Sequence, residues 1–304
     1  MSRLTSSVVL RSAAAALLAL GGPAQAIVGG TSTTAFGHVG TGVQVTDNWV
    51  LTARHVALGV GGTYSNGYGS SLVDLVVHYS PGSVFPEHDL SLMRLGTGIL
   101  AAPDLAIIGD VLPAGLLAAP LPATIATDGN QVPRGYAHTT VRGVADQLDP
   151  DGAGARGLVP VNYLITYQLP DRAAAPYVQG GDSGGALFFG TVTDSTSPLW
   201  GITSAFISGT DAGGAFNMSG FVQLASYRHW IDTTLATYAP VGPAPQTIQW
   251  ISAVPEPQAW VLMAAGAALL TLLRRGGHRG GQVLPFAPDG LARLRKDRQS
   301  PSES

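Results

Sequence analysis

The sequence contains no cysteine, and Lys296 is the only lysine among its 304 residues. The absence of cysteine excludes disulfide bonds, cysteine nucleophiles and cysteine-ligated zinc sites. Charged residues make up only 12% of the chain, which excludes a coiled coil or a long helical bundle, because such folds need many charged helix formers. Since 45% of the residues are apolar, disorder throughout the chain is excluded as well.

The few charges are unevenly distributed. Residues 27–253 carry seven basic and fifteen acidic side chains, whereas residues 274–304 carry seven basic and three acidic ones. The middle of the chain is therefore clearly negative, and such a surface does not attract phosphate backbones. We expect no nucleic-acid partner.

Glycine and proline are abundant, with 40 and 21 residues. They separate short apolar or alternating stretches, which is typical of closely spaced strands in an all-β barrel or sandwich. The stretches are Gly42–Val45, Trp49–Thr52, Leu72–His78 and Leu199–Phe206. Four prolines between residues 113 and 133 predict a linker there, and the spacing of Tyr227, Trp230 and Ile231 predicts a helix over Ala225–Leu235.

The N-terminus has the pattern of a secretory signal peptide. Arg3 and Arg11 flank the start of an apolar run, and the run is followed by Ala24-Gln25-Ala26, an A-x-A pattern that signal peptidase accepts. We therefore expect residues 1–26 to be a signal peptide and the mature chain to begin at Ile27. The alternative, a buried N-terminal helix, fits the short run and its basic flanks less well.

The C-terminal part predicts a membrane segment. A proline-rich linker over 241–253 precedes an uncharged hydrophobic stretch, residues 258–273, which ends at Arg274-Arg275. This length is at the lower limit for a helix that crosses a bilayer. The positive-inside rule would keep the arginines and the basic tail, residues 276–304, on the cytoplasmic side of the inner membrane. The alternative is a buried core helix, but no other predicted element follows the linker for it to pack on.

Three motifs carry the chemistry. They are Leu51-Thr52-Ala53-Arg54-His55, then His88-Asp89-Leu90-Ser91, and then Gly180-Gly181-Asp182-Ser183-Gly184-Gly185. A serine hydroxyl is a poor nucleophile unless a base lies within hydrogen-bond reach, and an imidazole base needs a carboxylate to hold its tautomer. We therefore predict His55, Asp89 and Ser183 as catalytic residues. The glycines permit backbone N–H groups to face a substrate, so Gly181 and Ser183 are the predicted oxyanion-hole donors.

No metal or cofactor is expected. The other histidines lack the spacing of metal ligands such as H-x-x-x-H. The run Asp149-Pro150-Asp151-Gly152 resembles the start of a calcium loop, but the later bidentate acid is missing, which favours a surface turn.

Taken together, the motifs resemble the trypsin/chymotrypsin-like serine peptidases, from Ile27-Val28-Gly29-Gly30 to the helix around Trp230. The resemblance implies two six-stranded antiparallel β-barrels in a domain spanning 27–240, with the active site between them. The barrels would cover about 27–112 and 134–224, joined by the linker 113–133. It also implies that the Ile27 amine, once freed by cleavage, pairs with Asp182 and orders the oxyanion hole.

The same resemblance places a substrate pocket. Its members would be Tyr177, Ser204, Phe206 and Gly220. Tyr177 stands where trypsin-like members place the acid that binds basic side chains, and Phe206 replaces a glycine that often keeps the pocket open. The resemblance therefore implies a preference for small or apolar side chains rather than basic ones at P1, the substrate residue before the cleaved bond.

The C-terminus resembles a second, independent feature. Val254-Pro255-Glu256-Pro257, the hydrophobic stretch and Arg274-Arg275 look like the PEP-CTERM sorting signal of Gram-negative bacteria, here residues 254–275. The resemblance implies processing by an exosortase near Pro-Glu-Pro, after passage through the periplasm, and delivery to the cell surface or the extracellular matrix. The further tail of residues 276–304 departs from the usual signal, which ends soon after its basic cluster.

The sequence therefore predicts a secreted serine endopeptidase that acts on proteins or peptides. Two alternatives remain open. One is a catalytically silent protease-fold protein that binds a polymer or protein at the cell surface or in the matrix. The other is an esterase, which would share the chemistry and differ in the shape of its pocket.

Overall fold

The structure is a computed structural model that describes residues 27–128, 135–150, 157–168, 175–211, 214–240 and 246–253. The chain divides into two compact units, residues 1–253 and 254–304, and all described residues belong to the first. The predicted signal peptide, sorting signal, membrane segment and basic tail lie outside the described residues. Within the described ranges, no helix is long and apolar enough to cross a membrane.

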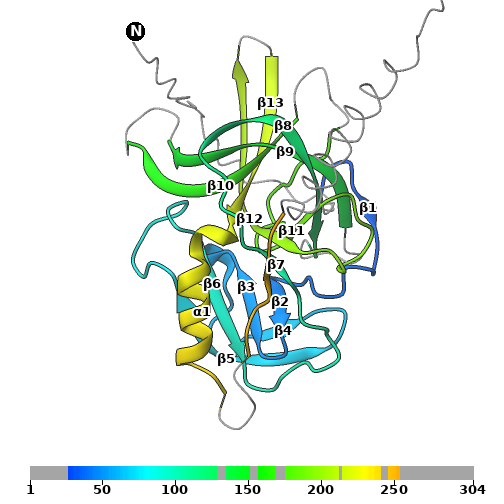
Figure 1. The fold of residues 1–304 in the computed structure, drawn as a ribbon, viewed down its shortest axis with the longest axis vertical. Coiled ribbons are helices and arrows are strands. Elements are labelled where there is room, and N and C mark those ends of the chain that lie inside the picture. The colour runs from blue at the N-terminus through cyan, green and yellow to red at the C-terminus, as the bar shows by residue number, and fades with distance from the viewer. Residues whose placement is uncertain are drawn as a thin grey trace, which may run out of the picture. The chain divides into compact units, whose positions relative to one another are not determined.

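The first sheet has five antiparallel strands in the order β2-β3-β6-β5-β4, drawn in blue and cyan in Figure 1. Their bounds are β2 (Val43–Thr46), β3 (Trp49–Thr52), β4 (Thr63–Ser65), β5 (Ser70–His78) and β6 (Ser91–Leu95). Val50, Tyr64 and Met93 are fully buried inside it. A short 3-10 helix, η1 (Arg54–Val56), follows β3.

A sixth strand was expected in this half, and an irregular segment takes its place. Val39 forms a single bridge to Val43 of β2, and Gly37 accepts a backbone hydrogen bond from Gly67 beyond β4. Gly40 explains the tight packing, since a Cβ there would lie 2.1 Å from the Ser65 carbonyl oxygen. Any side chain at residue 40 would therefore clash with the neighbouring backbone.

The second sheet closes on itself. Strand β11 (Ala186–Phe189) pairs with both β8 (Gly115–Thr127) and β12 (Leu199–Asp211). The ring is completed by β9 (Gly135–Leu148), β10 (Val159–Gln168) and β13 (Gly214–Gln223). All six pairings around the ring are antiparallel. This half is the expected six-stranded antiparallel barrel.

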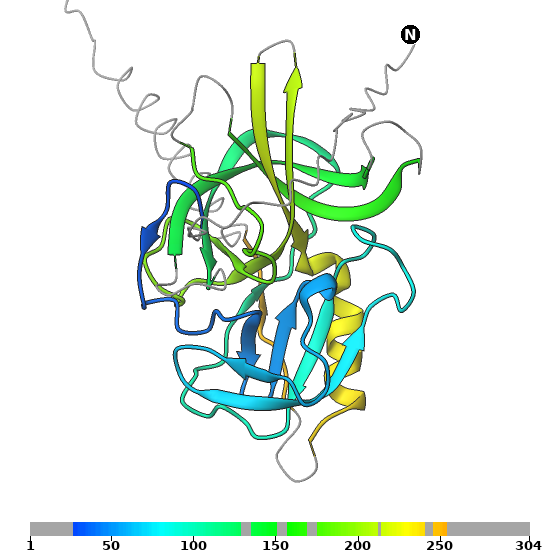
Figure 2. The same cartoon turned by 180° about the vertical axis from the view of Figure 1, so that it is seen from behind.

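Segments from outside the expected second barrel also join its sheet. The N-terminal strand β1 (Thr31–Ser32) pairs with β9, and β7 (Ile107–Ile108) pairs in parallel with β12. Figure 2 shows β1 in dark blue beside the green strands, away from the strands of the first sheet. The boundary predicted at residue 112 is therefore not a clean division between the two sheets.

The predicted linker 113–133 is largely strand. Residues 115–127 form β8, although Pro120 and Pro122 lie within it. The prolines fall in the half of β8 that is mostly exposed and does not pair with β11, and the register on β9 shifts between Leu116 and Leu121. Proline is tolerated at such edges and bulges because no ladder N–H is required there.

The second predicted linker, 241–253, also contains ordered structure. After the helix α1 (Arg228–Thr237), the chain returns as a strap, residues 246–253, drawn in orange in Figure 1. Its strand β14 (Trp250–Ile251) pairs in parallel with β7. At one end Gln246 hydrogen-bonds to Thr46 and Asn48 of the first sheet, and at the other Ser252 and Ala253 both donate to Asp110.

The predicted C-terminal helix is present as η3 (Leu224–Tyr227) followed directly by α1. Tyr227 and Trp230 both pack edge-on against Tyr79, at the start of the loop that leads to Asp89. The helix therefore supports the segment that carries one of the predicted catalytic residues.

Candidate active site

His55 lies in η1, immediately after strand β3 ends in a fully buried stretch. Asp89 precedes β6, and its carboxylate is completely buried. The carboxylate accepts two hydrogen bonds from His55, one from its backbone N–H at 3.0 Å and one from Nδ1 at 2.7 Å. Because Nδ1 faces a carboxylate it carries the hydrogen, which leaves Nε2 as an acceptor toward Ser183.

Ser183 lies in the turn that leads into β11, and its Oγ is 2.9 Å from Nε2 of His55. The turn is pressed against the first sheet: a Cβ at Gly184 would lie 2.5 Å from the Thr41 carbonyl oxygen and 2.8 Å from Oγ1 of Thr52. Gly184 also has a φ of 87°, which favours glycine. This close approach brings a serine from the second barrel to a histidine from the first.

The backbone around Ser183 presents free donors. Within the described part of the chain, the N–H groups of Gly181 and Ser183 donate to no other group, whereas those of Asp182, Gly184 and Gly185 do. Gly181 has a φ of 100°, which turns the peptide in a way that a side chain would resist. These two N–H groups are the ones that the sequence predicted for an oxyanion hole.

Ile27 and Asp182 are also brought together. Both are 1% exposed, and Oδ2 of Asp182 accepts from the Ile27 nitrogen at 3.3 Å and from the Gln179 N–H at 2.8 Å. In the uncleaved chain the Ile27 nitrogen is a neutral amide. Burial raises the pKa of Asp182 to about 6, although the hydrogen bonds from Gln179, Ile27 and Thr127 act in the opposite direction.

This raised pKa predicts a stability that depends on pH. An acid whose pKa is higher in the folded state stabilises the fold below its unfolded value, and this stabilisation is lost as the pH rises toward the folded value. For the uncleaved chain, carrying Ser183→Ala to prevent self-digestion, we expect the free energy of unfolding in urea to fall between pH 4 and pH 6 by up to about 3 kcal/mol. The same chain with Asp182→Asn should lack this fall, and an equal fall in both would contradict the prediction.

The predicted pocket residues divide into two groups. Tyr177 and Phe206 stack on each other, with ring centroids 5.5 Å apart and an interplanar angle of 19°. Ser204 instead directs its hydroxyl to Asp89, with its Oγ 2.5 Å from Oδ2. Gly220 is buried beside Ala205 on the neighbouring strand, and a Cβ there would lie 2.9 Å from the Tyr163 ring. The stacked pair is thus the part of the predicted pocket whose side chains could meet a substrate.

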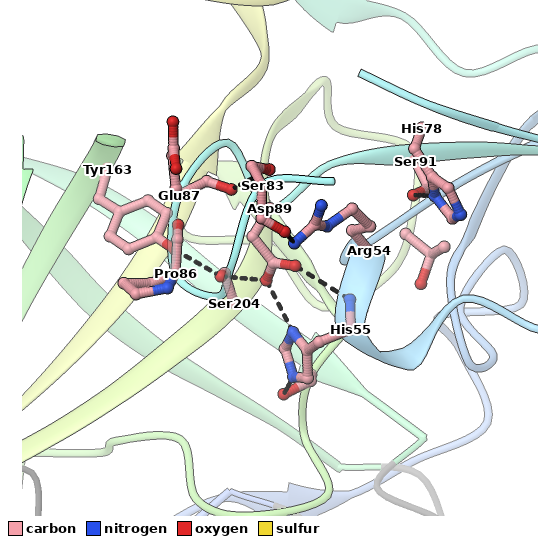
Figure 3. Close-up of polar contacts among 12 residues, drawn as sticks. Arg54, His55, His78, Ser83, Pro86, Glu87, Asp89, Ser91, Tyr163 and Ser204 are labelled. Atoms are coloured by element: carbon pink, nitrogen blue, oxygen red, sulfur yellow. Dashed lines mark hydrogen bonds and ion pairs between the residues drawn. The ribbon is translucent and has the colours of Figure 1, made fainter. Parts of the chain in front are cut away.

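The sequence reading missed several neighbours of the catalytic residues. The Phe85 ring, 40% exposed, packs against the His55 ring at 4.7 Å. Arg54 donates to the carbonyl oxygens of Ser80 and Ser83 and so holds the loop before Asp89. Tyr163 hydrogen-bonds to Ser204 (Figure 3). Phe85 and Tyr163 lie in no recognisable motif, whereas Arg54 belongs to the motif Leu51-Thr52-Ala53-Arg54-His55 and could have been marked by its place next to His55.

A second serine–histidine pair was also not predicted from the sequence. Nδ1 of His38 is 2.8 Å from Oγ of Ser195, and Nε2 is 2.8 Å from the Pro103 carbonyl oxygen. Since Nε2 must donate to the carbonyl, Nδ1 accepts from the serine, as in a nucleophile–base pair. However, a carbonyl stands in place of the carboxylate, both residues are buried, and burial lowers the pKa of His38. The pair is shut off from substrate and serves as a contact within the fold.

A fold of two mainly antiparallel β-sheets, with a serine, a histidine and a buried aspartate joined between them, defines a class of serine peptidases. A protein-family model described as Trypsin matches residues 19–231, which is more than half of the chain. The chain therefore belongs to the trypsin family. A search of curated protein sequences gave no match.

Similar solved structures include kallikrein-related peptidase 10 in complex with Zn²⁺ and human heparin binding protein. The first is 20% identical, with a TM-score of 0.42, over 64% of this chain and 89% of the other. The second is 18% identical, with a TM-score of 0.46, over 72% of this chain and all of the other.

Proposed function

We propose that this protein is a secreted serine endopeptidase. The observation that carries the proposal is the continuous hydrogen-bonded chain from Asp89 through His55 to Ser183, with distances of 2.7 and 2.9 Å. A nucleophile, a base and an orienting carboxylate in this order are the parts that acyl transfer requires. Membership of the trypsin family supports a peptidase.

The catalytic cycle follows from the positions of the hydrogens. Oγ of Ser183 attacks the peptide carbonyl carbon while its proton moves to Nε2 of His55, and Asp89 stabilises the imidazolium that forms. The N–H groups of Gly181 and Ser183 stabilise the negative oxygen of the tetrahedral intermediate. His55 then gives its proton to the leaving amine, and water releases the acyl group from Ser183 by the same steps in reverse.

A fluorophosphonate probe tests this proposal directly, because it reacts with an activated serine and requires no knowledge of the substrate. We expect it to label Ser183 in the folded protein that begins at Ile27, as located by peptide mass spectrometry. A folded, processed protein without label would favour the silent binding protein, and label with hydrolysis of esters but not of peptides would favour the esterase.

Specificity is proposed to rest on the stacked rings of Tyr177 and Phe206. The two rings are in contact, and neither provides a charge for arginine or lysine, so a small or apolar P1 side chain is the proposed preference. The family resemblance places both rings in the substrate pocket.

Removal of one ring should therefore change the preference. We expect Phe206→Gly to raise kcat/KM for a P1 phenylalanine peptide relative to a P1 alanine peptide by about tenfold or more, the range in which apolar pockets discriminate. The control is Leu100→Gly, which removes another exposed apolar side chain and should leave the ratio unchanged. If the ratio does not change in Phe206→Gly, the ring does not limit the pocket.

Export and attachment complete the proposal. Residues 1–26 would be removed by signal peptidase in a Gram-negative bacterium. Residues 258–273 would then hold the chain in the inner membrane until an exosortase cuts near Pro255-Glu256-Pro257. An arginine at the bilayer centre costs about 2.5 to 3.5 kcal/mol on insertion scales, so Arg274 and Arg275 would prevent the segment from sliding through.

Intact mass spectrometry tests this processing. We expect a species that ends near residue 256 in cells with an exosortase and a chain that ends at Ser304 in cells without one. Neutral residues in place of both Arg274 and Arg275 should impair retention and processing together. The same change at Arg293 and Arg295 in the tail should not. An uncut chain in both kinds of cell would indicate a simple membrane anchor.

A further inference from the structure

The buried carboxylate of Asp89 depends on a hydroxyl as well as on His55. Its Oδ2 accepts hydrogen bonds from both Nδ1 of His55, at 2.7 Å, and Oγ of Ser204, at 2.5 Å. The side chain is 0% exposed, so water cannot replace either donor, and a buried charge is costly without its hydrogen bonds. The position of Oδ2 relative to His55 is therefore fixed in part by the orientation of Ser204.

Ser204 is in turn held by Tyr163. The Tyr163 hydroxyl, on strand β10, is 2.7 Å from Oγ of Ser204 and 3.0 Å from the carbonyl oxygen of Pro86, in the loop that carries Asp89. Figure 3 shows Tyr163, Ser204, Asp89 and His55 following one another in a single chain of contacts. Tyr163 is 1% exposed and has no path to the substrate.

The number of available hydrogens fixes which group donates and which accepts in these hydrogen bonds. An ionised carboxylate only accepts hydrogen bonds, so the single hydrogen of the Ser204 hydroxyl is donated to Asp89. The oxygen of Ser204 is then an acceptor. The single hydrogen of the Tyr163 hydroxyl faces two acceptors, Oγ of Ser204 and the carbonyl oxygen of Pro86, and is shared between them. Burial and the nearby charge of Asp89 raise the pKa of Tyr163 well above its ordinary value. The phenol therefore keeps its hydrogen at the neutral pH at which the peptidase would be assayed.

We propose that Tyr163 is a positioning residue for the catalytic carboxylate, acting through Ser204 and through the carbonyl of Pro86. The phenol orients the Ser204 hydroxyl toward Asp89 and fixes the loop before Asp89 to β10. It thereby keeps Oδ2 in line with Nδ1 of His55. This inference rests on the proposed peptidase function, since the pair that it positions is the base and its orienting acid.

Tyr163→Phe removes the hydroxyl and keeps the ring that packs against Gly220. We expect kcat for a peptide substrate to fall about fivefold, the size of one neutral hydrogen bond, with KM unchanged because Tyr163 does not meet the substrate. The matched control is Tyr64→Phe. Tyr64 is also fully buried, and its hydroxyl donates to the backbone carbonyls of His38 and Gly42. We expect Tyr64→Phe to lower the free energy of unfolding about as much as Tyr163→Phe does, but to leave kcat unchanged.

A double-mutant cycle shows whether the effect passes through Ser204. In a Ser204→Ala background, Tyr163→Phe should lower kcat by much less than fivefold, because the intermediate hydroxyl is already gone. Only the part of the fall in kcat that is transmitted through the Pro86 carbonyl should remain. Fully additive losses, or an unchanged kcat in Tyr163→Phe alone, would overturn the inference.

A measurement without turnover separates this inference from the proposed function. The hydrogen between Nδ1 of His55 and Asp89 can be observed by proton NMR as a resonance far downfield. Its resonance should shift in Tyr163→Phe and stay in place in Tyr64→Phe. Absence of fluorophosphonate label in the unmodified protein would refute the peptidase. An unshifted resonance in Tyr163→Phe would refute the role of Tyr163, whether or not the protein is a peptidase.

Discussion

Ser183→Ala should lower kcat/KM for a peptide substrate by at least about 10⁴-fold, with the fold retained. The reason is that the attacking oxygen is lost, while the donors of the oxyanion hole are left in place. His55→Ala should cause a loss of the same order, because the hydroxyl at 2.9 Å from its ring then has no base. The two changes together should cost little more than either alone, since the residues act as one unit.

The chain offers a matched control for this experiment. Ser195 also hydrogen-bonds to a histidine, but both members of that pair are buried. Ser195→Ala should reduce stability by about 1 kcal/mol and leave kcat/KM near that of the unmodified protein. A loss in Ser195→Ala as large as in Ser183→Ala would contradict the assignment of the nucleophile. Circular dichroism and urea unfolding of each variant would exclude a general loss of fold.

An additional residue before Ile27 should lower kcat/KM by about 10² to 10³-fold, the cost of losing one oxyanion-hole donor. A free amine at Ile27 would be an ammonium at neutral pH and would stabilise the ionised form of Asp182. The neutral amide of an extended chain leaves that carboxylate buried with a pKa of about 6, so near neutral pH its charge lacks a cation. The turn that presents Gly181 and Ser183 then loses support.

The comparison requires mature protein that begins at Ile27 and protein that begins at Ala26, both assayed at pH 7. Ile27→Val in the mature protein is the control, since it keeps the free amine and alters only the buried side chain. It should retain most of the activity. Equal kcat/KM for the two unsubstituted proteins would show that the turn needs no ammonium, and catalysis by Ser183 would be unaffected.

The sequence identified the three residues that the structure joins, because each motif has a chemical requirement that can be read locally. His55 and Asp89 lie next to apolar strands, and Ser183 lies among glycines, so their positions at strand ends follow from the pattern. The strands β2 and β3 and the helix α1 were predicted within a few residues for the same reason. Periodicity of apolar residues determines such elements locally.

The features that were missed depend on contacts between distant segments. Prolines suggested a linker where β8 runs, because the sequence does not show that its proline-containing half lies at an exposed bulge. Ser204 was assigned to the substrate pocket, whereas its orientation toward Asp89 is set by Tyr163, 41 residues away. No local pattern records a hydrogen bond between β10 and β12, which lie on either side of β13 in the sheet.

The strap of residues 246–253 gives the domain a mechanical property. If the C-terminal end is tethered to a membrane or matrix, tension enters at Ala253. It is borne first by the two hydrogen bonds to Asp110 and by the pairing of β14 with β7. The load is therefore spread into the sheet before it can reach α1, which supports the loop of Asp89. An attached enzyme could be pulled by its tether while its catalytic groups stay aligned.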